Sequence, residues 1–202
     1  MRSRAIYGCG GPALSAGERD FFRDVRPWGF ILFGRNVQTP DQVRSLVRAL
    51  RETVGDASAP VLIDQEGGRV ARLKPPHWHA RPPAARFGDL HTQNPEAARE
   101  AAYLNARLIA HDLAGLGINV DCLPVLDVPV AGAHDVIGDR AFAHDPATVI
   151  DLGRSQIEGL IEGGVLPVMK HIPGHGRAGA DSHLALPRVA AAAEELSASD
   201  FV

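Results

Sequence analysis

The stretch GFILF at residues 29–33 is a run of apolar residues that ends at Gly34. Three later runs are also mainly apolar: PVLI at 60–63, INVDCLPVL at 118–126 and VLPVM at 165–169. Runs without polar alternation are typical of parallel strands that are buried on both faces. The sequence therefore predicts four buried parallel strands.

Amphipathic helices are predicted between these strands, because each interval begins with a helix-capping residue followed by proline. The three starts are Thr39-Pro40, Asn94-Pro95 and Asp145-Pro146. Gln42 lies three residues after Thr39, which predicts a capping box. Apolar residues then recur at helical spacing until a glycine ends each helix. A fourth helix is predicted to begin near Ala191.

Alternating strands and helices predict an α/β fold with a parallel sheet. The first two strands start about 31 residues apart, close to one unit of an eight-stranded (β/α) barrel of about 250 residues. Polar residues follow the strands directly at Asn36, Asp64, Asp127 and Lys170-His171. Active sites lie at these strand ends in barrels and in doubly wound sheets alike, so the spacing leaves both open. Residues 74–92, rich in proline and histidine, are expected to form a long loop.

Composition narrows the class of protein. The 202 residues include 21 basic and 24 acidic side chains, so the net charge is -3 and nucleic-acid binding is not expected as the main function. Cys9 and Cys122 form no CxxC pair, which favours free thiols in a reducing compartment. Neither a secretory signal nor an apolar run of about 18 residues is present, so we expect a soluble cytoplasmic protein without a membrane partner.

The densest polar segment is KHIPGHGRAGADSH at residues 170–183. Asp181 precedes His183 by two residues, so its carboxylate could orient the imidazole of His183 as a general acid or base. Histidine and carboxylate are also the ligands of zinc and iron, so a metal site is the rival interpretation.

Two further segments carry charge near strand ends. DQEGGRVAR at 64–72 offers a carboxylate that could accept sugar hydroxyls and arginines with a rigid fork of donors, although a turn with solvated charges fits as well. IGDRAF at 137–142 places Arg140 ahead of a helix, and Asp139 is expected to support Arg140. Asp127 is either a support for a neighbouring site residue or a polar strand end.

Together with PVLDV at 124–128, these segments resemble the glycoside hydrolase family 3 β-N-acetylhexosaminidases, which bacteria use to recycle peptidoglycan. The resemblance implies a (β/α)8 TIM-barrel-type α/β fold, no cofactor, and a monomer whose small-molecule substrate is an N-acetylglucosamine-containing muropeptide. The implied substrate-binding residues are Asp64, Arg72, Arg140, Lys170 and His171. The implied catalytic dyad is His183 with Asp181.

The resemblance also implies a retaining mechanism, in which His183 serves as acid and then as base and a separate aspartate is the nucleophile. That aspartate is expected in a later Ser-Asp-Asp-like motif, whereas the only aspartate after His183 is Asp200. We therefore expect residues 1–202 to be an incomplete single barrel, the first half to two thirds, and to be inactive alone. A metal-dependent α/β-barrel hydrolase and a non-catalytic sugar-binding remnant remain the alternatives.

Overall fold

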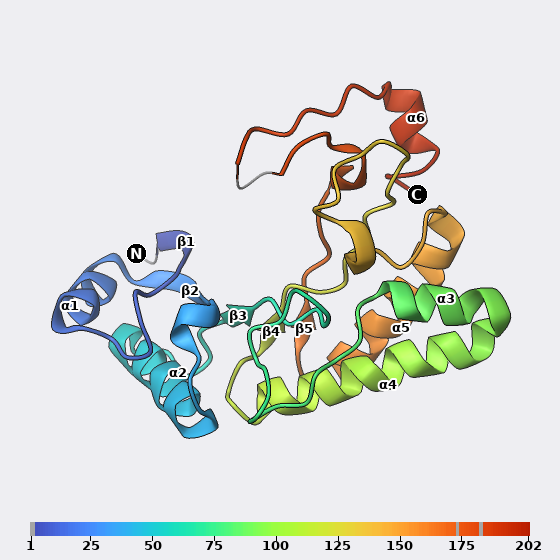
Figure 1. The fold of residues 1–202 in the computed structure, drawn as a ribbon. Coiled ribbons are helices and arrows are strands. Elements are labelled where there is room, and N and C mark those ends of the chain that lie inside the picture. Colours follow the sequence, from blue (N-terminus) through green and yellow to red (C-terminus); the bar gives the residue numbers. More distant parts are fainter. Residues whose placement is uncertain (1–2, 173, 182–183) are drawn as a thin grey trace.

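The computed structural model describes residues 3–172, 174–181 and 184–202 and contains a five-stranded parallel sheet (Figure 1). The strands are β1 (Ser3–Tyr7), β2 (Pro27–Leu32), β3 (Val61–Ile63), β4 (Val120–Asp121) and β5 (Leu166–Pro167). The predicted α/β class and the places of the four predicted parallel strands are confirmed, but the expected burial of the last strand was wrong, because Leu166 in β5 is 61 % exposed. Strand β1 was not predicted, because it alternates half-buried and exposed residues instead of forming an apolar run.

The strands follow one another across the sheet in chain order, and every neighbouring pair is parallel. The described sheet therefore has no reversal of strand order, which is the feature that defines the switch point of a doubly wound sheet. Closure of the strands into a barrel stays a prediction.

The helices confirm the three predicted starts. The elements are α1 (Ala16–Val25), α2 (Pro40–Val54), α3 (Ala85–Gln93), α4 (Pro95–Ala114), α5 (Pro146–Glu162) and α6 (Ala193–Ser197). Thr39, Asn94 and Asp145 each accept a hydrogen bond from the backbone N–H three residues later. Gln42 does not complete a capping box with Thr39, because its Oε1 accepts from the Gln38 N–H one residue earlier, at 2.8 Å.

The expectation of a loop across residues 74–92 was wrong in its second half, where α3 forms. Phe87 and Phe142 are buried together in an apolar cluster that α3 shares with α4 and α5. Gly88 makes this packing possible, since a Cβ on it would lie 1.7 Å from the carbonyl oxygen of Phe142. Tertiary packing thus outweighs the weak local signal of this segment.

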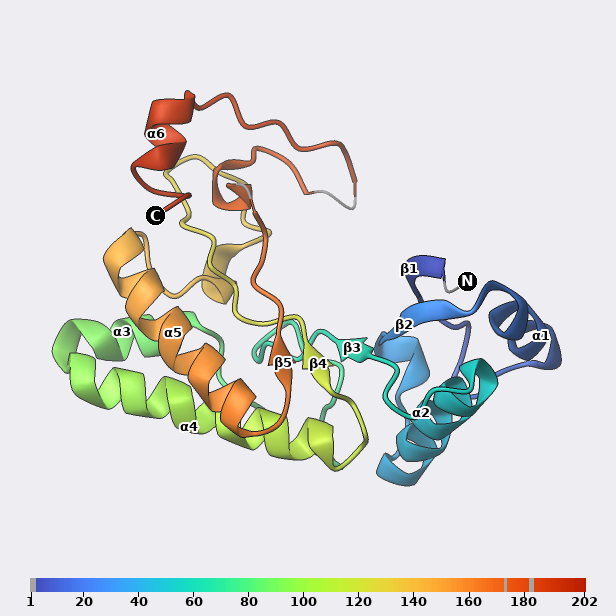
Figure 2. The same cartoon turned by 180° about the vertical axis from the view of Figure 1, so that it is seen from behind.

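The larger core fills the space between the sheet and its helices, with Phe30, Leu50 and Leu113 among its fully buried side chains. In Figure 1, α4 and α5 run side by side to one side of the strands, and Figure 2 shows the same pairing from behind. Cys9 and Cys122 are free thiols. In the described part of the chain, no helix is both long and apolar enough to span a membrane.

Candidate active site

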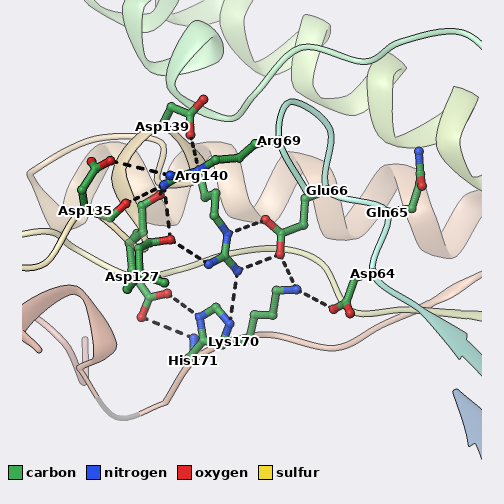
Figure 3. A network of polar contacts seen from close by, with 12 residues as sticks. Asp64, Gln65, Glu66, Arg69, Asp127, Asp135, Asp139, Arg140, Lys170 and His171 are labelled. Carbon is green, nitrogen blue, oxygen red and sulfur yellow. Dashed lines mark hydrogen bonds and ion pairs between the residues drawn. The ribbon is translucent and has the colours of Figure 1, made fainter. Parts of the chain in front are cut away.

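Three loops that leave the carboxyl ends of β3, β4 and β5 bring six charged side chains and one histidine together, and Figure 3 labels all of them except Arg72. Parallel strands end at one edge of the sheet, so segments far apart in sequence meet there. The seven residues are Asp64, Glu66, Arg72, Asp127, Arg140, Lys170 and His171. All five predicted substrate-binding residues are in this set, although their role stays a prediction.

The loop after β3 reverses direction at Gly67 and Gly68, whose φ angles are +105° and +53°. A side chain at Gly67 would also collide with the backbone, because its Cβ would lie 2.3 Å from the carbonyl oxygen of Pro82. The glycine pair therefore allows the tight turn that carries Asp64 and Glu66 on one side and Arg72 on the other.

Glu66 is the centre of a buried ion-pair cluster. Arg140 donates to it through both Nε and Nη2, at 2.8 Å and 2.9 Å, and Lys170 Nζ lies 2.5 Å from Oε1. The side chains of Glu66, Arg140 and Lys170 are only 5 %, 11 % and 11 % exposed. Burial alone would lower the pKa of Arg140, but the hydrogen bonds and charge of Glu66 outweigh it and raise that pKa above its usual value.

His171 is held from both ring nitrogens. Its Nδ1 lies 2.6 Å from Asp127 Oδ2, and its Nε2 lies 3.3 Å from Arg140 Nη2. Because a guanidinium can only donate, Nε2 is the acceptor of that contact and Nδ1 donates to Asp127. Asp127, with a side chain only 1 % exposed, thus supports His171, which settles the choice that the sequence left open.

Asp64 lies at the more accessible side of the cluster, with 19 % of its side chain exposed. Its Oδ1 accepts from Lys170 Nζ at 3.0 Å and its Oδ2 accepts from Arg72 Nη2 at 3.1 Å. Burial raises the pKa of Asp64, but Lys170 and Arg72 together outweigh it and hold the pKa below its ordinary value. Asp64 is therefore an ionised carboxylate with lone pairs left to accept ligand hydroxyls.

The expectation that Asp139 supports Arg140 was wrong, because Asp139 pairs with Arg69 instead. Arg69 Nε lies 3.0 Å from Asp139 Oδ1. Arg69 Nη2 also donates to three successive carbonyl oxygens in the loop that carries Arg140: those of Asp135, Val136 and Ile137. The sequence placed Asp139 beside Arg140 along the chain, whereas the loop turns the two side chains toward different partners.

The predicted dyad is described in part. His183 lies outside the described residues, so the dyad stays a prediction. Asp181 is half-buried and lines a hollow of about 350 Å³ together with Arg69, His134 and Arg140. Nearby, the ring of His175 lies 5.2 Å from that of His171, and burial lowers the pKa of His175 below its ordinary value.

Sequence reasoning gave no role to Glu66 and only an open one to Asp127. Both residues lie within the segments that drew attention, two residues after Asp64 and directly after a strand-like run. Their importance depends on burial and on partners more than 40 positions away, which a single sequence does not show.

A cluster of paired charges lies at the carboxyl edge of a parallel sheet, with partly exposed acceptors and donors on one side, and this is the edge at which α/β enzymes place small-ligand sites. The family model of the glycosyl hydrolase family 3 N terminal domain matches residues 16–202, and the chain belongs to this family.

Its relatives are hexosaminidases. A Beta-hexosaminidase of Methylococcus capsulatus is 40% identical over 192 residues, which cover 95% of this chain and 55% of that protein. NagZ from Neisseria gonorrhoeae in complex with N-trifluoroacetyl-D-glucosamine is 32% identical, with a TM-score of 0.91 over 98% of this chain and 58% of that one. The same NagZ in complex with zinc ion gives 31% identity and a TM-score of 0.90, with the same coverage of both chains. The chain thus spans a little over half the length of these relatives.

Proposed function

We propose that this chain supplies the N-acetylglucosamine-binding residues of a retaining β-N-acetylglucosaminidase. The observation that carries the proposal is Asp64, an ionised, partly exposed carboxylate held between Lys170 and Arg72. A carboxylate with flanking cationic donors matches the alternating donors and acceptors of sugar hydroxyls. Family membership and the binding of an N-acetylglucosamine analogue by NagZ support the same ligand.

In the proposed reaction, His183 protonates the glycosidic oxygen as a carboxylate attacks the anomeric carbon, and the electron pair of the broken bond goes to the leaving oxygen. His183, now neutral, then takes a proton from the water that cleaves the glycosyl-enzyme. We assign Asp181 to orient His183. Arg140, Lys170 and His171 complete the sugar site.

The nucleophile is not among these residues. Asp200 does not fit the role, because its Oδ2 lies 2.6 Å from Arg177 Nε and its side chain is 3 % exposed. We therefore expect residues 1–202 alone to bind the sugar with little or no turnover, as the alternative of a non-catalytic sugar-binding unit also predicts.

The natural substrate that we propose is a muropeptide fragment with a terminal β-linked N-acetylglucosamine. We assign the protein to peptidoglycan recycling in the cytoplasm, where it would act as a monomer without a cofactor. The alternative of a metal-dependent hydrolase finds support in the zinc-bound NagZ. The described residues, however, contain no group of three His, Cys, Asp or Glu side chains placed to hold a metal ion.

Calorimetric titration with N-acetylglucosamine tests the proposal. We expect the 202-residue chain to bind the sugar, Asp64→Asn to abolish measurable binding, and chelator to have no effect. Asp41→Asn serves as the matched control, because that carboxylate is 97 % exposed on α2. Absence of binding by the unmodified chain would contradict the proposed function, and loss of binding in chelator would favour the metal-dependent alternative.

A further inference from the structure

Asp121, the last residue of β4, is a carboxylic acid with no exposed surface. Its Oδ1 accepts a hydrogen bond from the backbone N–H of Gln65 at 3.0 Å. Its Oδ2 has no hydrogen-bond partner in the described part of the chain. Burial of a polar group that is only partly satisfied costs stability, so such a residue calls for a reason.

The place of this bond in the sheet gives the reason. Ile63 ends β3 and is paired with Asp121, and the Cys122 N–H still donates to the Ile63 carbonyl oxygen at 2.8 Å. Beyond that point β3 leaves the sheet and becomes the loop of the site. The backbone hydrogen bonds between β3 and β4 end here, and the Asp121 side chain instead accepts from the Gln65 N–H, the first backbone donor of the loop that has a partner on β4.

The side chain of Gln65 binds the backbone at the far end of the same loop. It is 4 % exposed, and its Oε1 accepts from the N–H groups of both Arg72 and Leu73 at 2.9 Å. Its Nε2 donates to the Leu73 carbonyl oxygen at 3.1 Å. Gln65 thus closes the base of the loop, with Asp64 before it in sequence and Glu66 after it.

We propose that Asp121 is a positioning residue, which holds the Gln65 backbone from inside the sheet and thereby sets the places of Asp64, Glu66 and Arg72. Asp121 does not touch the ligand. The assignment of Asp64 and Arg72 as sugar contacts rests on the proposed function, whereas the anchoring of residues 64–73 does not.

Burial, more than the charged groups around it, sets the direction in which the pKa of Asp121 moves. Burial raises the pKa of Asp121 well above its ordinary value; Asp64 and Glu66 act in the same direction, while the Gln65 N–H and Lys170 oppose it. A raised pKa favours the uncharged acid, which adds no third negative charge beside Lys170, the partner of Asp64 and Glu66. Asparagine has the same shape and also accepts a hydrogen bond, so Asp121→Asn is the conservative substitution.

Amide hydrogen exchange tests the anchoring without any ligand. In Asp121→Ala we expect the amides of Gln65, Arg72 and Leu73 to exchange about tenfold faster, as the loss of one hydrogen bond implies. Asp121→Asn should keep the rates of the unmodified chain. The α4 core amides of Ile109 and Leu113 report on global stability, and the change at the loop amides is compared with theirs in each variant.

Asp151→Ala is the matched control, because it removes a partly buried carboxylate from α5, away from the loop. If Asp121→Ala does not fold, Asp121→Ser carries the same comparison with a small polar group in the cavity. Unchanged exchange in the alanine or serine variant would overturn the proposal, and so would Asp121→Asn if it exchanged as fast as they do.

The same variants are then titrated with N-acetylglucosamine. We expect Asp121→Ala to bind about tenfold more weakly and Asp121→Asn to bind as the unmodified chain does. Faster exchange with unchanged affinity would overturn the positioning of the site. If the unmodified chain does not bind the sugar, the proposed function fails, while the exchange experiment still decides whether Asp121 anchors the loop.

Discussion

Neutralising Glu66 should destabilise the whole domain, because Glu66 compensates two buried cations. Glu66→Gln keeps the shape of the side chain and removes the charge that faces Arg140 and Lys170. Lys170 retains Asp64 as a partner, whereas Arg140 loses its carboxylate partner and keeps neutral acceptors such as a carbonyl oxygen and a histidine nitrogen. Breaking a buried ion pair in this way costs about 3–5 kcal/mol.

The retained Asp64–Lys170 pair places the expected loss at the lower end, about 3 kcal/mol in the free energy of unfolding. For a chain of this size, each kcal/mol lowers the melting temperature by about 2–4 °C, so the expected fall is roughly 6–12 °C. Urea unfolding at pH 7, followed by circular dichroism, measures the free energy directly, provided that the m-value does not change.

Glu52→Gln is the matched control, since Glu52 is 66 % exposed and lies as far as 3.9 Å from its partner Arg48. A surface pair of this kind contributes at most about 1 kcal/mol, so the control should unfold close to the unmodified chain. If Glu66→Gln unfolds at the same urea concentration as Glu52→Gln, the buried cluster does not stabilise the fold and our reasoning is wrong.

Three other predictions follow from particular contacts. The pKa of Asp64 is depressed in the folded state, so its stabilising contribution is complete above the ordinary aspartate pKa of about 4 and is lost as pH falls through the depressed value. Urea midpoints measured from pH 5 downward should therefore fall less steeply in Asp64→Asn than in the unmodified chain. Parallel curves for the two proteins would contradict the prediction. Arg69→Lys should raise the rate of amide exchange across residues 134–140 and weaken N-acetylglucosamine binding. The reason is that one ammonium cannot replace a guanidinium that contacts both the carbonyl oxygens and Asp139. Unchanged exchange in the variant would show that Arg69 does not hold this loop. Gly88→Ala should lower the melting temperature by more than about 6 °C, because the added Cβ collides with Phe142. In the control Gly17→Ala the added Cβ meets no atom within 4 Å, so the melting temperature should stay unchanged or rise. Equal melting temperatures of the two variants would show that α3 can shift freely.

The parts of the fold that sequence reasoning predicted are those with strong local signals. Caps such as Asn94 before Pro95 fix helix starts through a bond three residues away. The start of α1 carries an equally local signal, since Ser15 and Glu18 form a capping box. By contrast, β1 and α3 depend on neighbours that are distant in sequence, and neither has an apolar run or a capping residue that marks it.

The candidate site divides in the same way. Asp64 and Lys170 could be chosen from their places after strands, but Glu66 and Asp139 could not be interpreted correctly without their partners. Adjacency in sequence suggested that Asp139 serves Arg140, whereas Arg140 binds Glu66, which lies 74 positions away. Which charges pair across two loops depends on the backbone conformation of each loop, and that conformation cannot be inferred from the order of the residues alone.

Exposure separates two tasks among the seven clustered side chains. The side chains of Glu66, Asp127, Arg140 and Lys170 are between 1 % and 11 % exposed and satisfy one another or His171. Asp64, Arg72 and His171 keep 19 %, 27 % and 33 % exposed. The loss of a buried member is therefore expected to lower stability most, whereas the loss of a more exposed member is expected to weaken sugar binding with a smaller loss of stability.

This division predicts opposite signatures for two variants of similar chemistry. Glu66→Gln should lower the free energy of unfolding strongly, whereas Arg72→Gln should weaken N-acetylglucosamine binding with little change in stability. Because Arg72 and Asp64 are both more than one sixth exposed, solvent already screens their attraction, and its loss costs far less than that of a buried pair. If both variants lost stability equally, the site would be one cooperative cluster, and exposure would not distinguish its structural members from those that bind the ligand.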